Sequence, residues 1–172
     1  MQKPENDLLR QDEFWMRQAL KLAKGAAQRD EVPVGAILVH ADGKTVLAKG
    51  SNRREQWHTP LGHAELLALH RASQKQKAWR LVGSTLYVTL EPCLMCAGAI
   101  IQARVARVVY GATDPKAGAV HSLFQTLQDS RLNHRCELTT GILGEECSTI
   151  LKDYFRGKRA GKKANNKAQA TS

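Results

Sequence analysis

The sequence predicts an α/β fold, in which a mixed five-stranded sheet lies between two helical layers of a three-layer α/β/α sandwich. Two strand-like runs, 32–40 and 45–52, follow each other closely and predict an antiparallel hairpin. Strand-like and helix-like segments then alternate along the chain, which favours helices on both faces of the sheet. The run at 85–91 is apolar enough to be a central strand of that sheet.

The first expected element is a helix over 12–28. Its apolar residues recur at helical spacing on one face, at Met16, Ala19, Leu20, Ala23 and Ala27. The hairpin follows, and its turn holds Asp42 and Gly43, a pair that supplies the positive φ of a tight turn. A helix over 63–74 comes next, and Gly62 leaves its start unhindered.

The second half of the chain continues with strands and helices in turn. The expected elements are a strand at 85–91, a helix from 92, strands at 107–111 and 136–143, and a last helix over 145–158. Pro92 suits the first position of its helix, because the amide that proline lacks has no partner there. That helix is apolar on nearly every side, which predicts that more than one of its faces is covered.

Composition predicts one compact domain over 1–159, followed by a basic tail over 160–172. The 172 residues are 42% hydrophobic, enough for a core, and no repeat or linker divides them. The tail holds no apolar residue larger than alanine, so we expect it to be disordered. No apolar run is long enough to span a membrane and the start is too polar for a signal peptide, which favours a cytoplasmic protein.

Positive charge is concentrated at the end of the chain. The formal net charge is +10, and the last 21 residues hold seven Lys or Arg and one Asp. Such an excess often marks a protein that binds a polyanion, most commonly a nucleic acid. A solvated tail that keeps the protein soluble accounts for the same composition.

Two of the four cysteines, Cys93 and Cys96, are spaced for a shared site. Positions i and i+3 lie on one face of the first turn of the helix, where the helix dipole favours thiolates. A redox pair, half of a metal site and two core residues all have this spacing. The element order does not match a thioredoxin-like fold, which argues against the redox interpretation.

A histidine and a glutamate before another helix favour the metal site. His63 and Glu65 precede Cys93 by about 30 residues. One imidazole and two thiolates give three ligands, and no fourth candidate lies nearby in sequence. Three protein ligands and one remaining position for water are typical of catalytic zinc, which lowers the pKa of that water to about 7. Glu65 is placed to exchange protons beside the metal; a role limited to the helix dipole is the alternative.

The combination H-x-E with P-C-x-x-C resembles the signature of the zinc-dependent nucleobase deaminases. Longer stretches resemble the bacterial tRNA-specific adenosine deaminases, from the first helix to about Arg159. These stretches are EVPVGAILV, GHAE, LYVTLEPCLMCAGAI, RVVYGATDPKAGAV, LNHRCE and DYFRGKR. The segment before GHAE, which contains His58, and His121 depart from the forms common in that family, and neither touches an expected ligand.

The resemblance implies a cytidine-deaminase-like fold, one zinc per subunit and a homodimer that converts adenosine to inosine at the wobble position of a tRNA anticodon. It implies that His63, Cys93 and Cys96 bind zinc and that Glu65 moves protons to the adenine and to the leaving amine. It also implies substrate contacts by Asn52, the Ala64 amide, Asp114, Tyr154, Phe155, Arg156, Lys158 and Arg159. Asn52 and Asp114 are equally typical of turns, and the last five of a plain amphipathic helix end.

Two other functions share part of this pattern. A deaminase of a free nucleobase, guanine or cytosine, has the same zinc motif but no need of the aromatic and basic segment DYFRGKR. A non-catalytic zinc protein that binds RNA needs a fourth ligand to close the metal site and leaves Glu65 without a role. The anticodon stem-loop of tRNA is therefore the expected partner.

Overall fold

The computed structural model describes residues 5–170, and side chains are described for residues 6–162. Its centre is a five-stranded sheet with the strand order β2-β1-β3-β4-β5. The strands are β1 (Gly35–Val39), β2 (Val46–Ser51), β3 (Thr85–Leu90), β4 (Arg107–Ala112) and β5 (Glu137–Thr140). β1 is antiparallel to β2 and β3, whereas β3, β4 and β5 are parallel. The mixed five-stranded sheet predicted from the sequence is confirmed.

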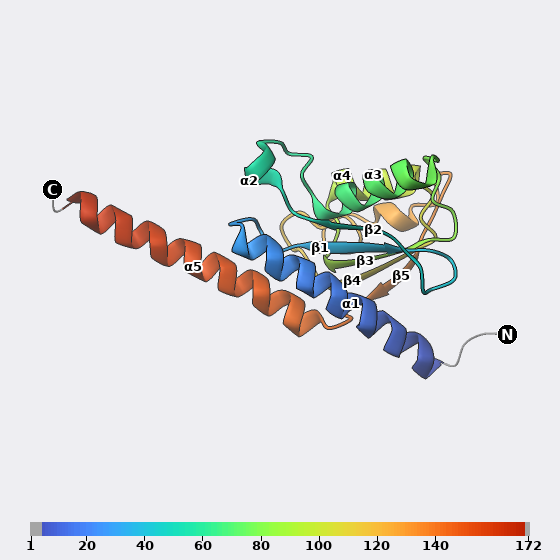
Figure 1. The fold of residues 1–172 in the computed structure, drawn as a ribbon, viewed down its shortest axis with the longest axis horizontal. Coiled ribbons are helices and arrows are strands. Elements are labelled where there is room, and N and C mark those ends of the chain that lie inside the picture. The colour runs from blue at the N-terminus through green and yellow to red at the C-terminus, as the bar shows by residue number, and fades with distance from the viewer. Residues whose placement is uncertain (1–4, 171–172) are drawn as a thin grey trace.

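Helices cover both faces of this sheet. They are α1 (Glu5–Gln28), α2 (Arg54–Trp57), α3 (Ala64–Gln76), α4 (Leu94–Gln102), the 3-10 helix η1 (Thr126–Gln128) and α5 (Gly144–Ala170). Figure 1 shows α1 and α5 on one face and α3 and α4 on the other. The predicted three-layer α/β/α sandwich is therefore confirmed.

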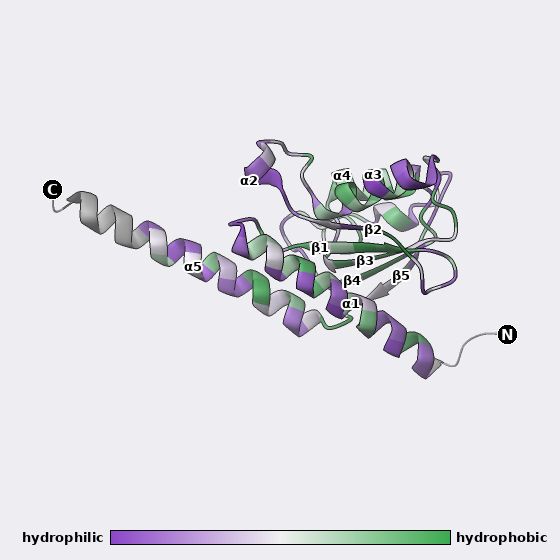
Figure 2. Cartoon of the chain, in the orientation of Figure 1, coloured by the Kyte–Doolittle hydropathy of each residue, from purple (hydrophilic) through white to green (hydrophobic). Residues whose placement is uncertain are grey.

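The strand β1 shows how the core is divided between the two faces. Successive side chains of a strand point to opposite faces, so Ile37 and Val39 pack with α1 residues such as Met16. Ala36 and Leu38 pack with α3 and α4 instead. All five residues of β1 are buried, and β1 is green in Figure 2 because an inner strand is apolar on both faces.

Several element ends differ from the expected ones. α1 begins at Glu5, before residue 12, because polar residues that continue a helix carry no apolar periodicity. β1 and β5 are shorter than expected, and α2 was not expected at all: it has four residues and buries none. α5 continues past 158 to Ala170, through the segment expected to be disordered, since its Ala, Lys and Gln residues have high helix propensity. Residues 171–172 lie outside the described residues.

None of the helices within residues 5–170 is both long and apolar enough to cross a membrane. The longest helix, α5, extends away from the other elements at its C-terminal end (Figure 1). It is amphipathic, as the alternation of purple and green in its coloured part in Figure 2 shows, and its sequence is rich in Lys and Arg. Its first turns pack on the sheet, where Cys147 and Ile150 join the core with α1.

A buried ion pair joins α1 to the sheet. The Arg107 guanidinium donates to both Asp12 carboxylate oxygens, at 2.8 and 2.6 Å, and the Tyr87 hydroxyl donates to the same carboxylate at 3.0 Å. Asp12 is 2% exposed. Burial and the negative charge of Asp12 raise the pKa of Tyr87, so its hydroxyl stays a donor.

We expect Asp12→Ala to lower the free energy of unfolding by about 3–5 kcal/mol, because it leaves Arg107 charged and partly buried without its partner. Urea denaturation of the purified variant measures this loss. Asp7→Ala, an exposed position on the same helix, is the control and should change little. A loss below about 1 kcal/mol for Asp12→Ala would show that the pair does not hold α1 on the sheet.

Candidate metal centre and active site

The expected ligands come from the starts of two helices on the same face of the sheet. His63 is the residue before α3, with an extended backbone, and Cys93 is the residue before α4. Cys96 lies in the first turn of α4 and is fully buried. The approach of α3 depends on Gly50 of β2: a Cβ there would lie 2.0 Å from the Ala64 carbonyl oxygen. Glycine at this position therefore lets the strand place His63 beside the cysteines.

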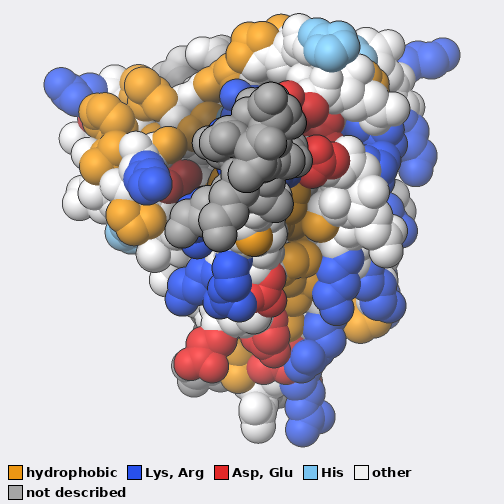
Figure 3. All heavy atoms as spheres, turned by 90° about the vertical axis from the view of Figure 1, so that its left-hand side faces the viewer, with side chains coloured by type: hydrophobic (Ala, Val, Ile, Leu, Met, Phe, Trp, Pro, Cys, Tyr) orange, Lys and Arg blue, Asp and Glu red, His pale blue; other side chains and the backbone are white. Residues whose placement is uncertain are grey.

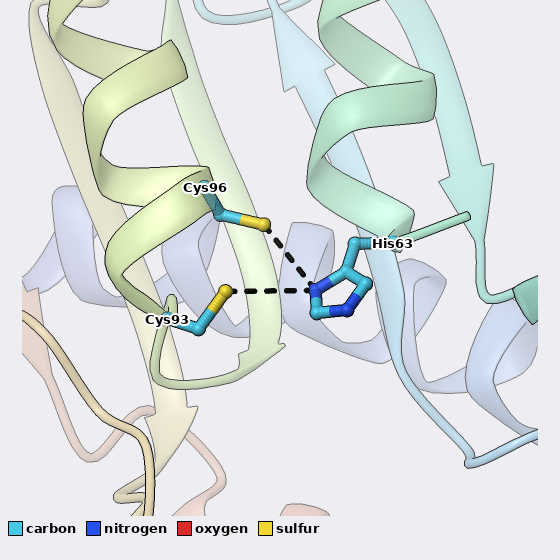
Figure 4. Close-up of side chains that lie close together, drawn as sticks. All are labelled: His63, Cys93 and Cys96. Carbon is cyan, nitrogen blue, oxygen red and sulfur yellow. Dashed lines mark hydrogen bonds between the residues drawn. The ribbon is translucent and has the colours of Figure 1, made fainter. Parts of the chain in front are cut away.

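α4 begins two residues later than expected. Pro92 precedes Cys93, which caps the helix, and Leu94 is the first helical residue. The Cys93 carbonyl accepts the Ala97 amide at 2.8 Å, so Cys93 is the cap and Pro92 lies outside the helix. The extended conformation of Cys93 turns its side chain toward His63, which the regular helix expected from 92 does not require (Figure 4).

The three side chains point toward one another (Figure 4). His63 Nδ1 lies 3.6 Å from Cys93 Sγ and 3.4 Å from Cys96 Sγ. Zinc bonds of about 2.3 Å to sulfur and 2.0–2.1 Å to nitrogen, at a tetrahedral angle, place such atoms about 3.5 Å apart. The distances between the donor atoms therefore fit a tetrahedral zinc ion. Within the described residues this group has three members, and Glu65 is not among them.

The hydrogen bonds within the group shift the pKa values of the two thiols in opposite directions. Hydrogen bonds from Cys96 and His63 lower the pKa of Cys93 to about 3, although burial opposes this. The same contact with Cys93, together with burial, raises the pKa of Cys96. The hydrogen bond to Cys93 also raises the pKa of His63. The contacts therefore favour a thiolate at Cys93, and a divalent cation would also favour loss of the Cys96 proton.

Glu65 is a buried carboxyl group in the first turn of α3. It is 4% exposed and faces the same cavity as His63 and Cys93. Burial raises its pKa to about 7, and its backbone hydrogen bond and His63 oppose this only in part. A carboxyl group in that range can both accept and donate a proton at neutral pH. The geometry therefore suits the proton-transfer role predicted for Glu65.

The site opens on a cavity of about 800 Å³. Its wall includes eight of the residues predicted for the site: Asn52, His63, Glu65, Cys93, Asp114, Phe155, Arg156 and Arg159. Arg54, Lys116 and Lys152 also line the cavity and were not predicted. Arg54 is two residues after the predicted Asn52, and Lys116 is two residues after the predicted Asp114. Their closeness in sequence to these two residues could have indicated both. A cavity of this size holds a nucleoside.

Asn52 and Ala64 are joined to each other. The Asn52 carboxamide oxygen accepts the Ala64 amide at 2.9 Å, and both residues are buried. In this structure the Ala64 amide therefore donates its hydrogen bond to Asn52, although it was expected to contact the base. The bond fixes the Asn52 side chain at the cavity wall, and its NH₂ group is the part that remains for a substrate.

Asp114 takes part in a turn as well as lining the cavity. One of its carboxylate oxygens accepts the Lys116 and Ala117 amides at 3.0 and 3.2 Å. The loop that contains it is held by Glu91, which was not predicted for the site. Burial disfavours the Glu91 anion, but hydrogen bonds from the His121 amide, Ser122 and the Asp114 amide outweigh burial and lower its pKa to about 2.

The residues predicted on α5 lie on two sides of the helix. Phe155, Arg156 and Arg159 line the cavity, as described above. The Tyr154 hydroxyl donates to the Asp30 carbonyl at 3.0 Å, and Lys158 pairs with the Asp30 carboxylate. These two residues line a second hollow, which shares Phe155 and Arg159 with the cavity. Figure 3 shows this end of the molecule, where Lys and Arg side chains gather below and beside the grey atoms.

His58 and His121, which depart from the forms common in the family, are both exposed. His58 ends α2 with a left-handed backbone, φ 50°. His121 Nδ1 lies 2.7 Å from the Tyr110 hydroxyl, and its amide donates to Glu91. Neither lines the cavity within the described residues.

Comparison with known proteins places the chain in a family. Residues 10–159 match the MafB19-like deaminase family. The tRNA-specific adenosine deaminase of Bacillus subtilis (strain 168) is 47% identical over 157 residues, which cover 91% of this chain and 96% of that protein. The tRNA-specific adenosine deaminase of Haemophilus influenzae is 46% identical over 152 residues, with 88% and 87% covered.

Solved structures agree with the sequence relatives. A structure from a study of A-to-I editing by tRNA:A34 deaminases at the wobble position of transfer RNA has a TM-score of 0.75 at 43% identity, covering 79% of this chain and 97% of that one. The guanine deaminase of Nitrosomonas europaea has a TM-score of 0.74 at 25% identity, with 83% of each chain covered. From the matched domain, the metal-ligand geometry and these identities, the chain belongs to the tRNA-specific adenosine deaminase family.

Proposed function

We propose that this protein hydrolyses adenosine to inosine at the wobble position of a tRNA anticodon. The observation that carries the proposal is the group of His63, Cys93 and Cys96, which opens with the buried carboxyl of Glu65 on one cavity. Relatives at 47% and 46% identity are tRNA-specific adenosine deaminases. The substrate places the reaction in the cytoplasm.

His63, Cys93 and Cys96 would hold one zinc ion per subunit, since their donor atoms fit its bond lengths and softness. When bound, zinc supplies hydroxide at neutral pH. The cavity beside the group admits the base, and only a flipped-out adenine brings C6 to this depth. Asn52 would bind the purine edge through its NH₂ group, because its oxygen is engaged by Ala64.

Glu65 would move the protons of the reaction. It takes a proton from the attacking water and gives it to N1 of adenine as the oxygen bonds to C6. It takes the second proton of that oxygen and gives it to the amino group, so that the C6–N bond breaks and ammonia leaves. The products are inosine and ammonia, and one water is consumed. Burial of Glu65 keeps bulk water from competing for these protons.

Two observations favour RNA over a free nucleobase. The cavity rim carries Phe155 and the cations Lys152, Arg156 and Arg159, which suit the stacked bases and phosphates of a single-stranded loop. The guanine deaminase is 25% identical to this chain, far below the 47% of a tRNA-specific deaminase.

The ligand group argues against a non-catalytic zinc protein. A structural zinc site needs a fourth ligand, and the group has three members within the described residues.

Mass analysis of an adenosine-containing anticodon stem-loop tests the function. Incubation with the zinc-loaded protein should raise the mass by about one unit, because NH is replaced by O. Free guanine, cytosine and adenosine are offered in parallel and ammonia is measured. Release of ammonia from a free base, with the stem-loop unchanged, would contradict the RNA assignment.

The side of α5 that lines the cavity should contribute to the salt dependence of RNA binding. For Arg156→Ala with Arg159→Ala we expect weaker binding of the stem-loop and a shallower plot of log K against log salt. The slope should fall by about 0.7 for each lost phosphate contact. Binding titrations at several salt concentrations measure it. Lys21→Ala with Lys24→Ala, exposed on α1, removes the same charge and is the control; an equal change there would show that only net charge matters.

A homodimer is also part of the proposal. Leu94 and Met95 at the start of α4 and Leu123 and Phe124 before η1 are 36–54% exposed. The bridge between Cys93 and Gly118 and the hydrogen bond from the Leu123 amide to the Gly118 carbonyl connect these two segments, so we infer that the four side chains share one apolar surface. In a single chain this apolar surface, which includes one face of α4, is exposed to solvent. A second copy of the chain would cover it. Sedimentation equilibrium measures the oligomeric state.

A further inference from the structure

One buried carboxylate outside the predicted motif organises the cavity wall. Glu91 directly follows β3 and is 2% exposed. One of its oxygens accepts the amides of Val120, His121 and Ser122 at 3.1, 2.7 and 2.9 Å, and the other accepts the Asp114 amide at 2.9 Å and the Ser122 hydroxyl. A carboxylate offers about four lone-pair sites. Its acceptor capacity is therefore used by the protein, and none remains for a substrate.

All these donors belong to the loop 113–122, whose first residues, 113–117, line the cavity. The loop fits closely around the carboxyl group: a Cβ at Gly118 would lie 2.4 Å from it. The loop also pairs with the two residues after Glu91. The Ala119 amide donates to the Pro92 carbonyl at 2.8 Å, and Gly118 bridges to Cys93.

We propose that Glu91 is a positioning residue for substrate binding: its carboxylate holds the loop 113–122 as one wall of the cavity, beside the segment 91–93 that joins β3 to α4. This inference rests on the proposed function for the identity of the substrate. Glu91 acts through the loop, because its oxygens accept hydrogen bonds from Asp114, Val120, His121 and Ser122. A loop of this length has no regular structure to hold it, so the buried anion replaces a ladder of backbone hydrogen bonds.

Replacement of the anion by an amide should release the loop. Glu91→Gln keeps the shape but turns one acceptor into a donor that faces backbone amides, so several buried N–H groups lose their partner. We expect an increase of at least about tenfold in KM for the anticodon stem-loop and less than about a threefold change in kcat, with zinc content unchanged. Hydrogen exchange of 113–122 should be faster, a readout that does not depend on RNA.

A second variant tests the same contact without a change of charge. Gly118→Ala places a methyl group against the Glu91 carboxyl and should give the same rise in KM and the same faster exchange. Glu137→Gln, which removes an exposed carboxylate on β5, is the control and should leave KM and exchange as in the unmodified protein. Should Glu91→Gln not fold, Gly118→Ala and Ser122→Ala decide the outcome.

The outcomes separate this inference from the proposed function. No deamination of the stem-loop by the unmodified protein is a failure of the proposed function. Activity in the unmodified protein, with KM unchanged in the folded Glu91 or Gly118 variants, overturns the role of Glu91. Loss of zinc together with kcat in Glu91→Gln also overturns it, because the residue then acts on the metal group. A rise in KM with faster exchange of the loop and full zinc supports it.

Discussion

Glu65→Ala should lower kcat for the anticodon stem-loop by about 10²–10⁴-fold or more, the range that general acid–base catalysis contributes. The protein should keep its zinc, because Glu65 is not a member of the ligand group. The reason for the large effect is that one buried carboxyl group handles both proton transfers. The cavity wall holds a second buried acid, Glu91, but its oxygens accept hydrogen bonds from the loop 113–122, so it does not replace Glu65. Single-turnover assays with bound stem-loop, and metal analysis of the same sample, measure both quantities.

A matched control separates loss of the proton carrier from loss of a negative charge. Glu145→Ala removes an exposed carboxylate at the start of α5, outside the cavity, and should retain full kcat. Glu65→Gln should resemble Glu65→Ala in rate, because the amide fills the space but carries no exchangeable acid proton. Unchanged activity of either Glu65 variant would refute the proton-transfer role, and zinc lost from both would show that Glu65 supports the metal.

Cys96→Ser should both abolish zinc binding and lower the thermal stability of the protein. The Cys96 thiol is fully buried and lies 3.4 Å from His63 Nδ1, and among the described residues the ligand group has no further member to replace it. Binding at free zinc 1,000 times Kd stabilises a fold by about 4 kcal/mol. For a chain of this size each kcal/mol shifts Tm by about 2–4 °C, so we expect Tm to fall by roughly 8–16 °C. Metal analysis and calorimetry, with and without a chelator, measure both effects.

Cys136→Ser is the control for this loss. Cys136 is also a buried thiol, but its Sγ donates to the Val105 carbonyl at 3.2 Å and it is not a member of the ligand group. This variant should keep its zinc, and a chelator should lower its Tm as it does in the unmodified protein. A chelator should have no effect on Cys96→Ser. Full zinc occupancy in Cys96→Ser would show that the ligand has been wrongly identified.

The helical periodicity of α5 predicts that its aromatic and basic residues lie on two sides of the helix. Tyr154 and Lys158 are four residues apart, as are Phe155 and Arg159, so each pair lies on its own side of a helix. The structure places one pair at Asp30 and the other on the cavity. The sequence shows that there are two sides. Which of them meets the cavity depends on how the helix packs on α1 and the sheet.

The grouping of His63, Cys93 and Cys96, with Glu65 on the same cavity, could be predicted because its signal is local. Each of these residues lies at the start of a helix in a short motif, and the chemistry of a thiolate pair and an imidazole is legible in the residue types. The alternation of strands and helices was local as well, so the three layers followed from it. The ends of α1 and α5 were missed, because polar residues that continue a helix leave no apolar pattern.

What the sequence alone determined is therefore the class of fold and the chemical inventory of the site: one imidazole, two thiolates, a carboxylate and a basic, aromatic helix. Only the tertiary structure decided that Ala64 donates to Asn52, that Cys93 caps its helix after Pro92, and that Glu91 holds the loop of Asp114. Each is a contact made after the chain has folded, often between residues distant in sequence. Such contacts depend on which backbone amides the fold brings to a buried acceptor, and no residue type reveals that in advance.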